Sequence, residues 1–322
     1  MHAIEVAETG GPEVLNYVEK QQPVAGSGEV LIKSEAIGVN FLDTYFRSGQ
    51  YPREVPFILG NEVCGTVEAV GDDVAALQVG DRVVTAQANG AYGEYCLAQA
   101  DYCAYVPEGV DADVAAASLL KGMTAHYLIK STYPVQQGDA VLVHAGAGGV
   151  GLILTQWAKH LGATVIGTVG SPEKAELARA NGCDHVIDYS REDFAARVKE
   201  ITKGEGCHVV YDGVGKATFP ASLDCLRPFG TFVSYGTASG PIPSFDIMLL
   251  MQKGSLFATW QLLFHHLARR EDVVAMSDEL FNVVLSGAVK IPVHTRMPLV
   301  QVAEAHRRLE ARQTTGATVL LP

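Results

Sequence analysis

Basic residues are scarce in this sequence of 322 residues. Lys and Arg number 24 against 36 Asp and Glu, so the formal net charge is −12, and no basic run offsets the deficit locally. Nucleic acids and anionic membrane surfaces are bound through clustered positive charge. We therefore expect no nucleic-acid partner and no membrane association.

Disulfide, membrane and export signals are missing as well. There is no C-x-x-C pair, no apolar run approaching the roughly 20 residues that span a bilayer, and no basic stretch followed by an apolar one at the N-terminus. The cysteines are scattered at Cys64, Cys96, Cys103, Cys183, Cys207 and Cys225. This usage is typical of reduced thiols, so we expect a soluble protein of the cytoplasm.

Signatures of hydrolysis and of zinc binding are also absent. The sequence contains neither a G-x-S-x-G elbow nor H-E-x-x-H. Cys64 has no second thiolate or imidazole at ligand spacing. The segment 39–43, which is expected to close a strand, and the segment 60–62 carry asparagines, which are poor zinc ligands. We expect no metal.

Glycine is abundant, and the length suits two domains. The 33 Gly are about a tenth of the chain and follow no repeat, so they mark turns and close backbone approaches. In the first third, short alternating runs at 29–33, 65–70 and 81–85 are bounded by Gly, Pro and Asp. This pattern is typical of a mainly antiparallel sheet or barrel.

From residue 138 onward, strand-like runs alternate with segments of helical length, which predicts an α/β domain with a doubly wound parallel sheet. The predicted strands are 140–144, 164–168, 185–188, 208–212 and 231–234, and the predicted helices are 150–161, 172–181, 191–203 and 217–226. Helices at 272–285 and 299–311 and a strand at 317–321 follow. We expect this tail to rejoin the first domain, because it cannot bury its apolar faces alone.

A glycine-rich loop joins the first of these strands to the first helix. Gly146, Gly148 and Gly151 fit G-x-G-x-x-G in that context. The tight turn and the approach of a pyrophosphate both exclude a Cβ, and the helix start at Gly149 and Val150 offers free N–H groups. The loop predicts a dinucleotide site; a purely structural glycine turn is the alternative.

The residues after the second strand favour NADP(H). An NAD-binding chain usually has Asp or Glu about 20 residues beyond the first glycine, but 166–171 holds no carboxylate. Ser171 is the expected N-cap of the next helix, with Pro172 at N1 and Lys174 at N3. A cation in the first turn opposes the helix dipole unless an anion lies there, and the 2′-phosphate of NADP is such an anion. A solvated surface lysine is the alternative.

A set of short motifs runs along the whole chain. They are the glycine loop in its A-x-x-G-x-x-G form and the segments 60–65, 80–83, 120–125 and 252–256. Together they resemble the zinc-free quinone oxidoreductases of the medium-chain dehydrogenase/reductase superfamily, the group that includes zeta-crystallin. The resemblance implies a GroES-like, mainly-β catalytic domain over 1–124, completed by 262–322, and a Rossmann NADP-binding domain over 125–261. It also implies a cleft at their junction and a homodimer formed through an edge of the Rossmann sheet.

The same resemblance implies roles for individual residues near the nicotinamide. It places Asn40, Asp43 and Tyr45 on the nicotinamide side of the cleft and Tyr51 near the substrate mouth. Thr124 is a further nicotinamide contact, because its motif matches the start of the family's inter-domain helix. Half-buried aromatic side chains without a catalytic role are the alternative for Tyr45 and Tyr51.

Other implied residues surround the rest of the cofactor. Gly170, Lys174 and Tyr189, with Ser171 beside them, are expected to surround the adenosine 2′-phosphate, and Arg312 is expected to reach the cofactor from the tail. Tyr235 and Gly236 lie at the end of the fifth strand, where open α/β sheets bind their ligands. A solvated cation at a helix end is the alternative for Arg312.

The implied activity is the NADPH-dependent reduction of a quinone or a related conjugated carbonyl. Orientation alone supplies roughly 7–11 kcal/mol of a barrier, so Asn40, Tyr45 and Tyr51 would orient the acceptor and donate hydrogen bonds. Many relatives carry Thr-Arg-Pro where residues 259–261 read Thr-Trp-Gln, which leaves the acceptor open. A 2-alkenal or enoyl reductase on the same fold, and a non-catalytic NADPH- or RNA-binding protein, are the alternatives.

Overall fold

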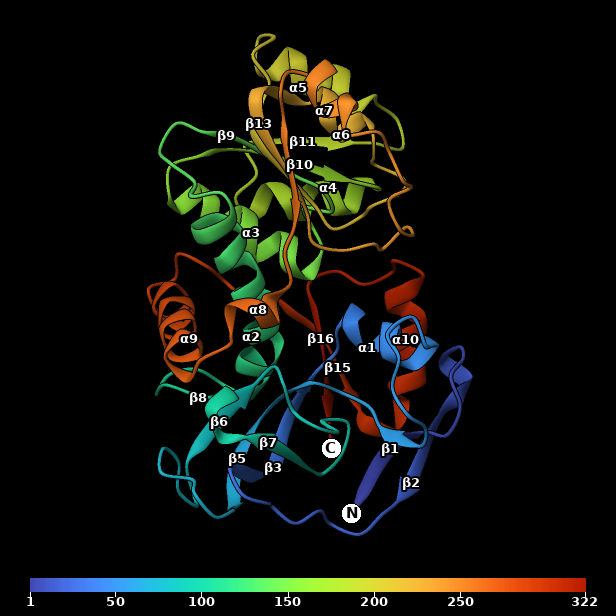
Figure 1. Ribbon diagram of the computed structural model, residues 1–322, viewed down its shortest axis with the longest axis vertical. Coiled ribbons are helices and arrows are strands. Elements are labelled where there is room, and N and C mark those ends of the chain that lie inside the picture. The colour runs from blue at the N-terminus through green and yellow to red at the C-terminus, as the bar shows by residue number, and fades with distance from the viewer. The chain divides into compact units, whose positions relative to one another are not determined.

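The computed structural model describes residues 1–322 as two compact units (Figure 1). The first comprises Met1–Lys121, Leu267–Leu285 and Ile291–Pro322, and the second comprises Gly122–His266 and Ser286–Lys290. The tail therefore belongs to the same unit as the N-terminal residues, except for Ser286–Lys290. These bounds differ by a few residues from the domain division proposed from the sequence.

The second unit is built around a parallel sheet. Its strands are β9 (Ala140–Val143), β10 (Thr164–Val169), β11 (His185–Asp188), β12 (Cys207–Asp212), β13 (Leu226–Ser234) and β14 (Phe257–Trp260). They lie in the order β11-β10-β9-β12-β13-β14 and every neighbour pairs in parallel. The winding reverses between β9 and β12, and ligands of such sheets bind at the carboxyl ends of the strands at this switch point. The predicted α/β class with a doubly wound sheet is confirmed.

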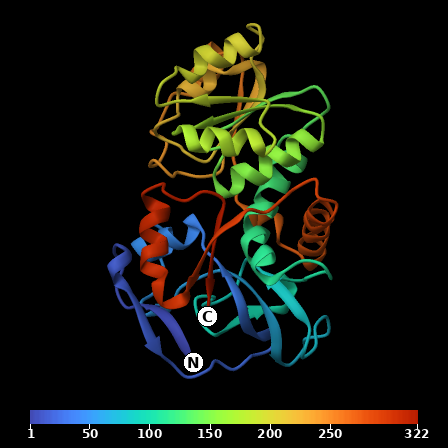
Figure 2. The same ribbon diagram turned by 180° about the vertical axis from the view of Figure 1, so that it is seen from behind.

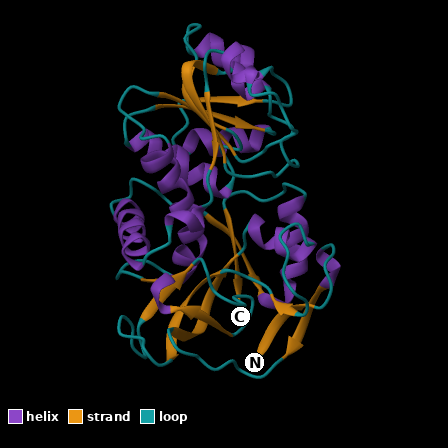
Figure 3. Ribbon diagram, viewed as in Figure 1, coloured by secondary structure: helices purple, strands orange, loops and turns teal.

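Helices lie on both sides of this sheet (Figure 3). They are α3 (Gly149–His160), α4 (Pro172–Ala180), α5 (Phe194–Ile201), α6 (Ala221–Asp224) and α7 (Met248–Gln252), with a π-helical segment at Leu128–Thr132 and α8 (Leu263–His266) outside the alternation. The prediction over 217–226 is wrong in length. Proline disfavours helical conformation in the residue before it, and α6 begins only after Pro220. The prediction over 191–203 is also too long, because Asp193 caps α5.

The first unit is mainly β. Its larger sheet runs β15-β16-β3-β5-β6-β8 with β7 paired to β3, and a smaller sheet runs β2-β1-β4. All pairs are antiparallel except β15 with β16. The strands are β1 (His2–Val6), β2 (Leu15–Glu19), β3 (Glu29–Gly38), β4 (Phe57–Ile58), β5 (Glu62–Val70), β6 (Arg82–Thr85), β7 (Tyr95–Gln99), β8 (Cys103–Tyr105), β15 (Val293–Pro298) and β16 (Ala317–Leu321). The antiparallel character predicted for the first third is confirmed.

The remaining helices correct two expectations. They are α1 (Phe41–Ser48), α2 (Ala112–Tyr127), α9 (Arg270–Leu285) and α10 (Val302–Glu310), with 3-10 turns at Pro12–Val14, Ala100–Tyr102 and Leu299–Gln301. Residues 39–43 do not close a strand: β3 ends at Gly38, and Asn40 is the N-cap of α1. Residues 121–124 lie inside α2 and not at a helix start. No helix of the protein has the length and apolar character needed to cross a membrane.

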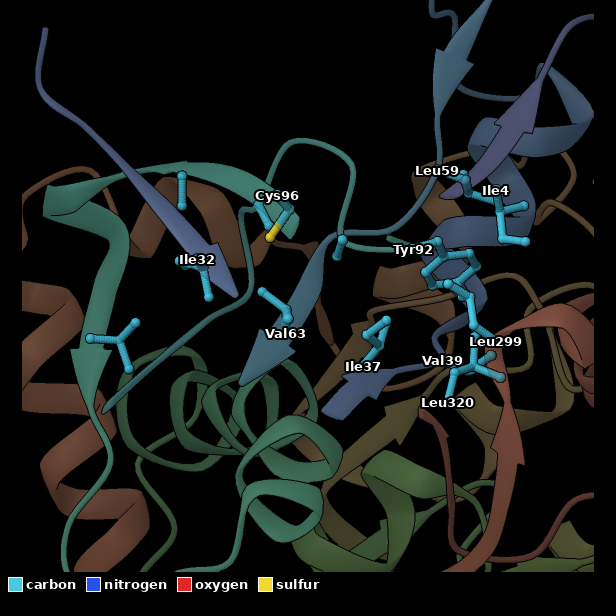
Figure 4. Packing of buried hydrophobic residues seen from close by; sticks show 14 of the residues in the cluster. Ile4, Ile32, Ile37, Val39, Leu59, Val63, Tyr92, Cys96, Leu299 and Leu320 are labelled. Atoms are coloured by element: carbon cyan, nitrogen blue, oxygen red, sulfur yellow. The ribbon is translucent and has the colours of Figure 1, made fainter. Parts of the chain in front are cut away.

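A large hydrophobic cluster lies in the interior of the first unit (Figure 4). Ile4 comes from the small sheet and Ile37 and Leu320 from the large one, and all are fully buried. Leu299, in the 3-10 turn before α10, and Val302, the first residue of α10, enter the same cluster. Figures 1 and 2 both show α10 beside α1. The tail therefore completes the core of the unit that the first residues begin.

Gly60 lies against this core in a left-handed conformation. Its φ is +99°, and a Cβ there would lie 2.3 Å from Cδ1 and 2.6 Å from the backbone nitrogen of Tyr92. Gly80 has a similar φ of +93°, but nothing lies within 4 Å of the equivalent position. Comparing substitutions at these two glycines therefore separates the cost of backbone strain from the cost of overpacking.

We predict that Gly60→Ala destabilises the protein more than Gly80→Ala. Both variants carry the cost of a left-handed L-residue, about 1–2 kcal/mol, and only Gly60→Ala adds an overpacking cost of about 1–3 kcal/mol. Urea denaturation of both variants measures the difference in the free energy of unfolding. Equal losses would show that the contact with Tyr92 relaxes without cost.

Candidate functional site

The glycine loop follows β9 at the switch point of the parallel sheet. Ala145 has a φ of +53°, which is uncommon for a residue with a Cβ. The Gly146 N–H donates to the Thr168 carbonyl at 3.0 Å, which ties the loop to β10. Gly151 lies so close to the loop that a Cβ would be 2.2 Å from the Ala145 carbonyl oxygen. A glycine is therefore required here for the helix to pack against the strand.

The first turn of α3 leaves backbone donors free. Gly148 is the N-cap, and the turn has no acidic residue. The N–H groups of Gly149, Val150 and Gly151 have no acceptor in the protein, and Leu152 is the first to bond back, to the Gly148 carbonyl at 2.9 Å. Free N–H groups at the positive end of a helix dipole form an anion-binding site.

A second cluster lies at the start of α4. Ser171 is the N-cap, its hydroxyl accepts the Lys174 N–H at 3.4 Å, and Pro172 follows at N1, as the sequence predicts. Tyr189 comes directly after β11, and its hydroxyl lies over Gly170, where a Cβ would be only 2.6 Å away. The fold thus brings Gly170, Ser171, Lys174 and Tyr189 to one place.

Asp212 ends β12 on the other side of the switch point. Its Oδ1 accepts the N–H groups of Val214 at 2.7 Å and Gly215 at 2.9 Å, and its Oδ2 accepts the Thr218 hydroxyl at 2.7 Å. These bonds fix the turn that follows the strand. The aspartate is fully buried, so its donors replace the water that a carboxylate otherwise requires.

His144 connects the two sides of the switch point. The ring is fully buried, with Nδ1 2.8 Å from the Thr168 hydroxyl and Nε2 2.9 Å from the Ser222 hydroxyl. Ser222 in turn lies 3.3 Å from Asp212 Oδ2. Burial lowers the pKa of His144, so the ring is a neutral bridge between the ends of β10 and β12.

The other residues expected near the cofactor in this unit lie just after β13 and within α2. Tyr235 and Gly236 follow the end of β13, and the Tyr235 N–H donates to the Asp212 carbonyl at 2.9 Å. A Cβ at Gly213 would be 2.8 Å from the Tyr235 ring, so only a glycine at this position leaves room for the ring. Thr124 is buried within α2.

In the first unit, Asn40 joins a buried charge pair. Its Oδ1 accepts from Lys121 Nζ at 2.6 Å, and its Nδ2 donates to Glu62 Oε2 at 2.8 Å. Lys121 Nζ also lies 3.3 Å from Glu62, whose Oε1 accepts the Leu120 N–H at 2.7 Å. The amide orientation follows from these partners, since a cation must face the oxygen and a carboxylate the nitrogen.

Asp43 holds the other side of Asn40. Its Oδ2 accepts the Asn40 backbone N–H at 2.8 Å and the Tyr92 hydroxyl at 2.9 Å, and its Oδ1 accepts from Asn61 at 2.9 Å. Burial raises the pKa of Asp43 to about 6, while the hydrogen bonds from Asn61, Asn40 and Tyr92 and the charge of Lys121 oppose that rise. Asp43 therefore gains or loses its proton at mildly acidic pH.

The two tyrosines predicted for the site touch one another. Tyr45 on α1 and Tyr51 beyond its end have ring centroids 5.3 Å apart, and the Tyr51 N–H donates to the Tyr45 carbonyl at 3.0 Å. Both rings are half-buried. Arg312 is exposed after α10, where its φ of +58° places a non-glycine residue in a left-handed helix terminus.

Comparison with known proteins places the chain in a family. Residues 26–133 match the alcohol dehydrogenase GroES-like domain, and residues 149–274 match the zinc-binding dehydrogenase family. A quinone oxidoreductase of Pseudomonas aeruginosa is 49% identical over 321 residues, which cover 99% of each chain. The chain belongs to the quinone oxidoreductase family. A second member, quinone oxidoreductase 1 of Escherichia coli, is 45% identical over 99% of both chains.

Solved structures of the family agree with this fold over its full length. A mycobacterial protein in complex with NADPH has a TM-score of 0.98 and 57% identity, and covers 100% of both chains. The Escherichia coli quinone oxidoreductase in complex with NADPH has a TM-score of 0.98 and 44% identity, again with 100% of both chains covered. A 2-haloacrylate reductase from Burkholderia is 45% identical over 98% of both chains.

The residues at this site do not fit zinc, although one matched family is described as zinc-binding. No group of His, Cys, Asp and Glu side chains is arranged to hold a metal ion. The Glu62 carboxylate already accepts from three donors, and the Lys121 ammonium beside it would repel a second cation. We assign no metal step to this family member.

The sequence reasoning missed several residues that the structure adds to the site. These are Arg47, Glu62, Tyr92, Lys121, His306 and Glu310. The pairs Asp43 with Arg47 and His306 with Glu310 are spaced i, i+4, which places each pair on one face of its helix. That spacing was a visible signal, but it did not indicate that these faces are buried.

We predict that Lys121→Met destabilises the protein by about 3–5 kcal/mol, the usual effect of removing one member of a buried ion pair. The variant leaves the Glu62 carboxylate without a counter-charge and the Asn40 oxygen without a donor. The double variant Lys121→Met with Glu62→Gln removes both charges and is expected to recover at least half of the loss. Urea denaturation of the wild type, both single variants and the double variant gives the four free energies of unfolding of a double-mutant cycle. Additive losses would mean that the two charges do not interact.

Proposed function

We propose that the protein reduces quinones with NADPH. Two features carry this proposal. The backbone N–H groups of Gly149, Val150 and Gly151 are free at the switch point, and Lys174 lies in the first turn of α4. A pyrophosphate and a 2′-phosphate are the anions that such positions suit. Relatives solved in complex with NADPH support the same assignment.

Binding at the adenosine end rests on side chains as well as on the loop. Lys174 supplies a cation, Ser171 a hydroxyl, and Tyr189 a hydroxyl over Gly170. The segment 166–171 offers no carboxylate to a ribose 2′-OH and none to repel a 2′-phosphate. We therefore assign Gly170, Ser171, Lys174 and Tyr189 to the 2′-phosphate, and Tyr235, Gly236, Thr124 and Arg312 to other parts of the cofactor.

The chemistry suits a site that orients and does not ionise its substrate. When bound, NADPH supplies a hydride, and a quinone that accepts it together with one proton becomes the quinol. Asn40 uses one of its two amide N–H groups for Glu62, which leaves the other for an acceptor oxygen. We assign Asn40, Tyr45 and Tyr51 to orienting the acceptor and to hydrogen bonding the oxygen on which negative charge develops. Asp43 holds Asn40 in place.

A conjugated carbon–carbon double bond is the second candidate acceptor. The full-length relative at 45% identity that is named 2-haloacrylate reductase favours this possibility. Hydride addition to an activated alkene requires the same orientation and the same hydrogen bonding to a carbonyl oxygen.

The test is the initial rate of NADPH oxidation with an ortho-quinone, a para-quinone and an α,β-unsaturated ketone, with and without chelator. We expect rapid quinone-dependent oxidation that a chelator does not change. Turnover of the enone alone would move the assignment to an alkenal reductase. Binding of NADPH without turnover of any acceptor would indicate a nucleotide-sensing protein.

We predict that Lys174→Ala raises the KM for NADPH by about tenfold or more and leaves the KM for NADH within about twofold. Loss of one charge-assisted bond to a phosphate is worth roughly 1.5–3 kcal/mol, and NADH has no 2′-phosphate. Lys199→Ala is the matched control, because Lys199 is an exposed lysine in the last turn of α5. Equal effects on both cofactors would remove Lys174 from the 2′-phosphate site.

We also propose a homodimer formed through β14. This strand is an edge of the parallel sheet, and unpaired strand edges are natural pairing surfaces. Phe257 and Trp260 on this strand are 62% and 50% exposed, and Phe229 beside it is 69% exposed. A second copy of the chain would cover these apolar side chains.

We predict that Trp260→Asp converts the dimer to a monomer, because a carboxylate buried at the interface would lose its water. Size-exclusion chromatography with light scattering gives the subunit number. Val24→Asp is the control, since Val24 is 86% exposed on the first unit. A monomeric wild type, or a dimeric Trp260→Asp variant, contradicts the proposed interface.

The same proposal includes the domain roles and the compartment. We assign the cofactor to the domain 125–261 and the acceptor to the domain 1–124 with 262–322. All six cysteines are free and buried, which supports a reducing compartment such as the cytoplasm.

A further inference from the structure

A row of buried polar side chains leads from the surface of the first unit to Asp43. Arg47 is 2% exposed, and Tyr92 and His306 are fully buried. Arg47 Nη1 lies 3.0 Å from His306 Nδ1, His306 Nε2 lies 3.1 Å from the Tyr92 hydroxyl, and that hydroxyl lies 2.9 Å from Asp43. None of the outer three belongs to the residues assigned above to the cofactor or the acceptor.

The hydrogen bonds in this row can run in only one direction. A guanidinium has donors and no acceptor, so Arg47 must donate to His306 Nδ1. Burial and the charge of Arg47 lower the pKa of His306 to about 3, so the ring is neutral and its single proton lies on Nε2. Nε2 then donates to the Tyr92 oxygen, and the Tyr92 hydroxyl donates to Asp43 Oδ2. Each donor polarises the next, which strengthens the bond that Asp43 receives.

Holding α1 against α10 does not require this row. Arg47 already joins the two helices through both of its terminal nitrogens, which donate to Glu310 at 3.1 and 2.6 Å, and Nε donates to the Gly10 carbonyl at 3.1 Å. His306 and Tyr92 extend beyond that contact and end on the oxygen that also accepts the Asn40 backbone N–H. Buried polar groups that a structural contact does not need are candidates for a functional role.

We propose that His306 and Tyr92 are positioning residues that keep Asp43 an ionised acceptor and so hold Asn40 in place for the acceptor. This rests on the proposed function. When Asp43 takes up a proton, the oxygen that carries it accepts less well: a proton on Oδ2 weakens the bonds from the Asn40 N–H and Tyr92, and a proton on Oδ1 weakens the bond from Asn61. The side chains that face Asp43 or lie within its network from the surrounding elements are Lys121, Glu62, Asn61, Tyr92, Arg47, His306 and Glu310.

The first test is the titration of Asp43 in the protein without cofactor or acceptor. Aspartate labelled with carbon-13 at the carboxyl carbon gives the midpoint, and Asp43→Asn identifies the signal. The wild-type midpoint is expected near pH 6. Tyr92→Phe is expected to raise it by about 0.5 to 1 pH unit, the equivalent of one hydrogen bond. The acid limb of kcat against pH in quinone reduction is expected to move in parallel.

The second test separates hydrogen bonding from proton transfer at His306. His306→Gln keeps an acceptor for Arg47 and a donor for Tyr92, so the midpoint of Asp43 is expected to stay near the wild-type value. His306→Leu has neither and is expected to shift it as Tyr92→Phe does. Glu310→Gln weakens the contact between α1 and α10 and leaves the row intact, so it is expected to lower stability without moving the midpoint.

An unchanged midpoint in folded Tyr92→Phe and His306→Leu overturns the proposal. Should both variants fail to fold, the wild type still decides, because nitrogen-15 shifts of His306 report which ring nitrogen carries the proton. A proton on Nδ1 would contradict the direction of the row. Absence of quinone turnover in the wild type refutes the proposed function, and it leaves the titration of Asp43 and its dependence on Tyr92 measurable.

Discussion

The first unit depends on the burial of two carboxylates, Asp43 and Glu62. Both are fully shielded from water, and an ionised carboxylate in that position must be matched by donors. Asp43 accepts from the Asn40 backbone, Asn61 and Tyr92, and Glu62 accepts from the Asn40 side chain, the Leu120 backbone and Lys121. Asn40 is the residue common to both sets, so its backbone and its amide are fixed from opposite sides. The position of this one side chain is the product of the whole arrangement.

The same principle organises the switch point of the parallel sheet. Asp212 is a third fully buried carboxylate, and its donors are the turn after β12 and the hydroxyls of Thr218 and Ser222. His144 links this cluster to Thr168 on β10 by a hydrogen bond to its hydroxyl. The Thr168 carbonyl in turn accepts the N–H of Gly146 in the glycine loop. The glycine loop proposed to bind the cofactor is therefore held in place by hydrogen bonds within the protein.

Whether the sequence alone predicts a contact depends on how many residues separate the two interacting side chains along the chain. The glycine loop and the cap of α4 were predicted, and the structure confirms their geometry, because every determinant lies within a few residues. The Asn40 network joins residues 22 and 81 positions apart, and the Tyr92–His306 contact spans 214 positions, so no local pattern shows it. The turn at Asn40 was misinterpreted as a strand end, although Asn40 and Asp43 have the spacing of a capping box. Pro220 likewise gave the signal that shortens α6.

Charge shows why local geometry outweighs composition at this site. The chain carries a net charge of −12, which repels an anionic cofactor at long range. At physiological ionic strength the Debye length is about 8 Å, so distant carboxylates contribute little to a phosphate already in contact. Within that distance the glycine loop presents uncharged N–H donors, and the first turn of α4 presents Lys174. With the site proposed above, affinity for the cofactor depends on these few local donors, and an acidic protein can bind a polyanion without any basic surface.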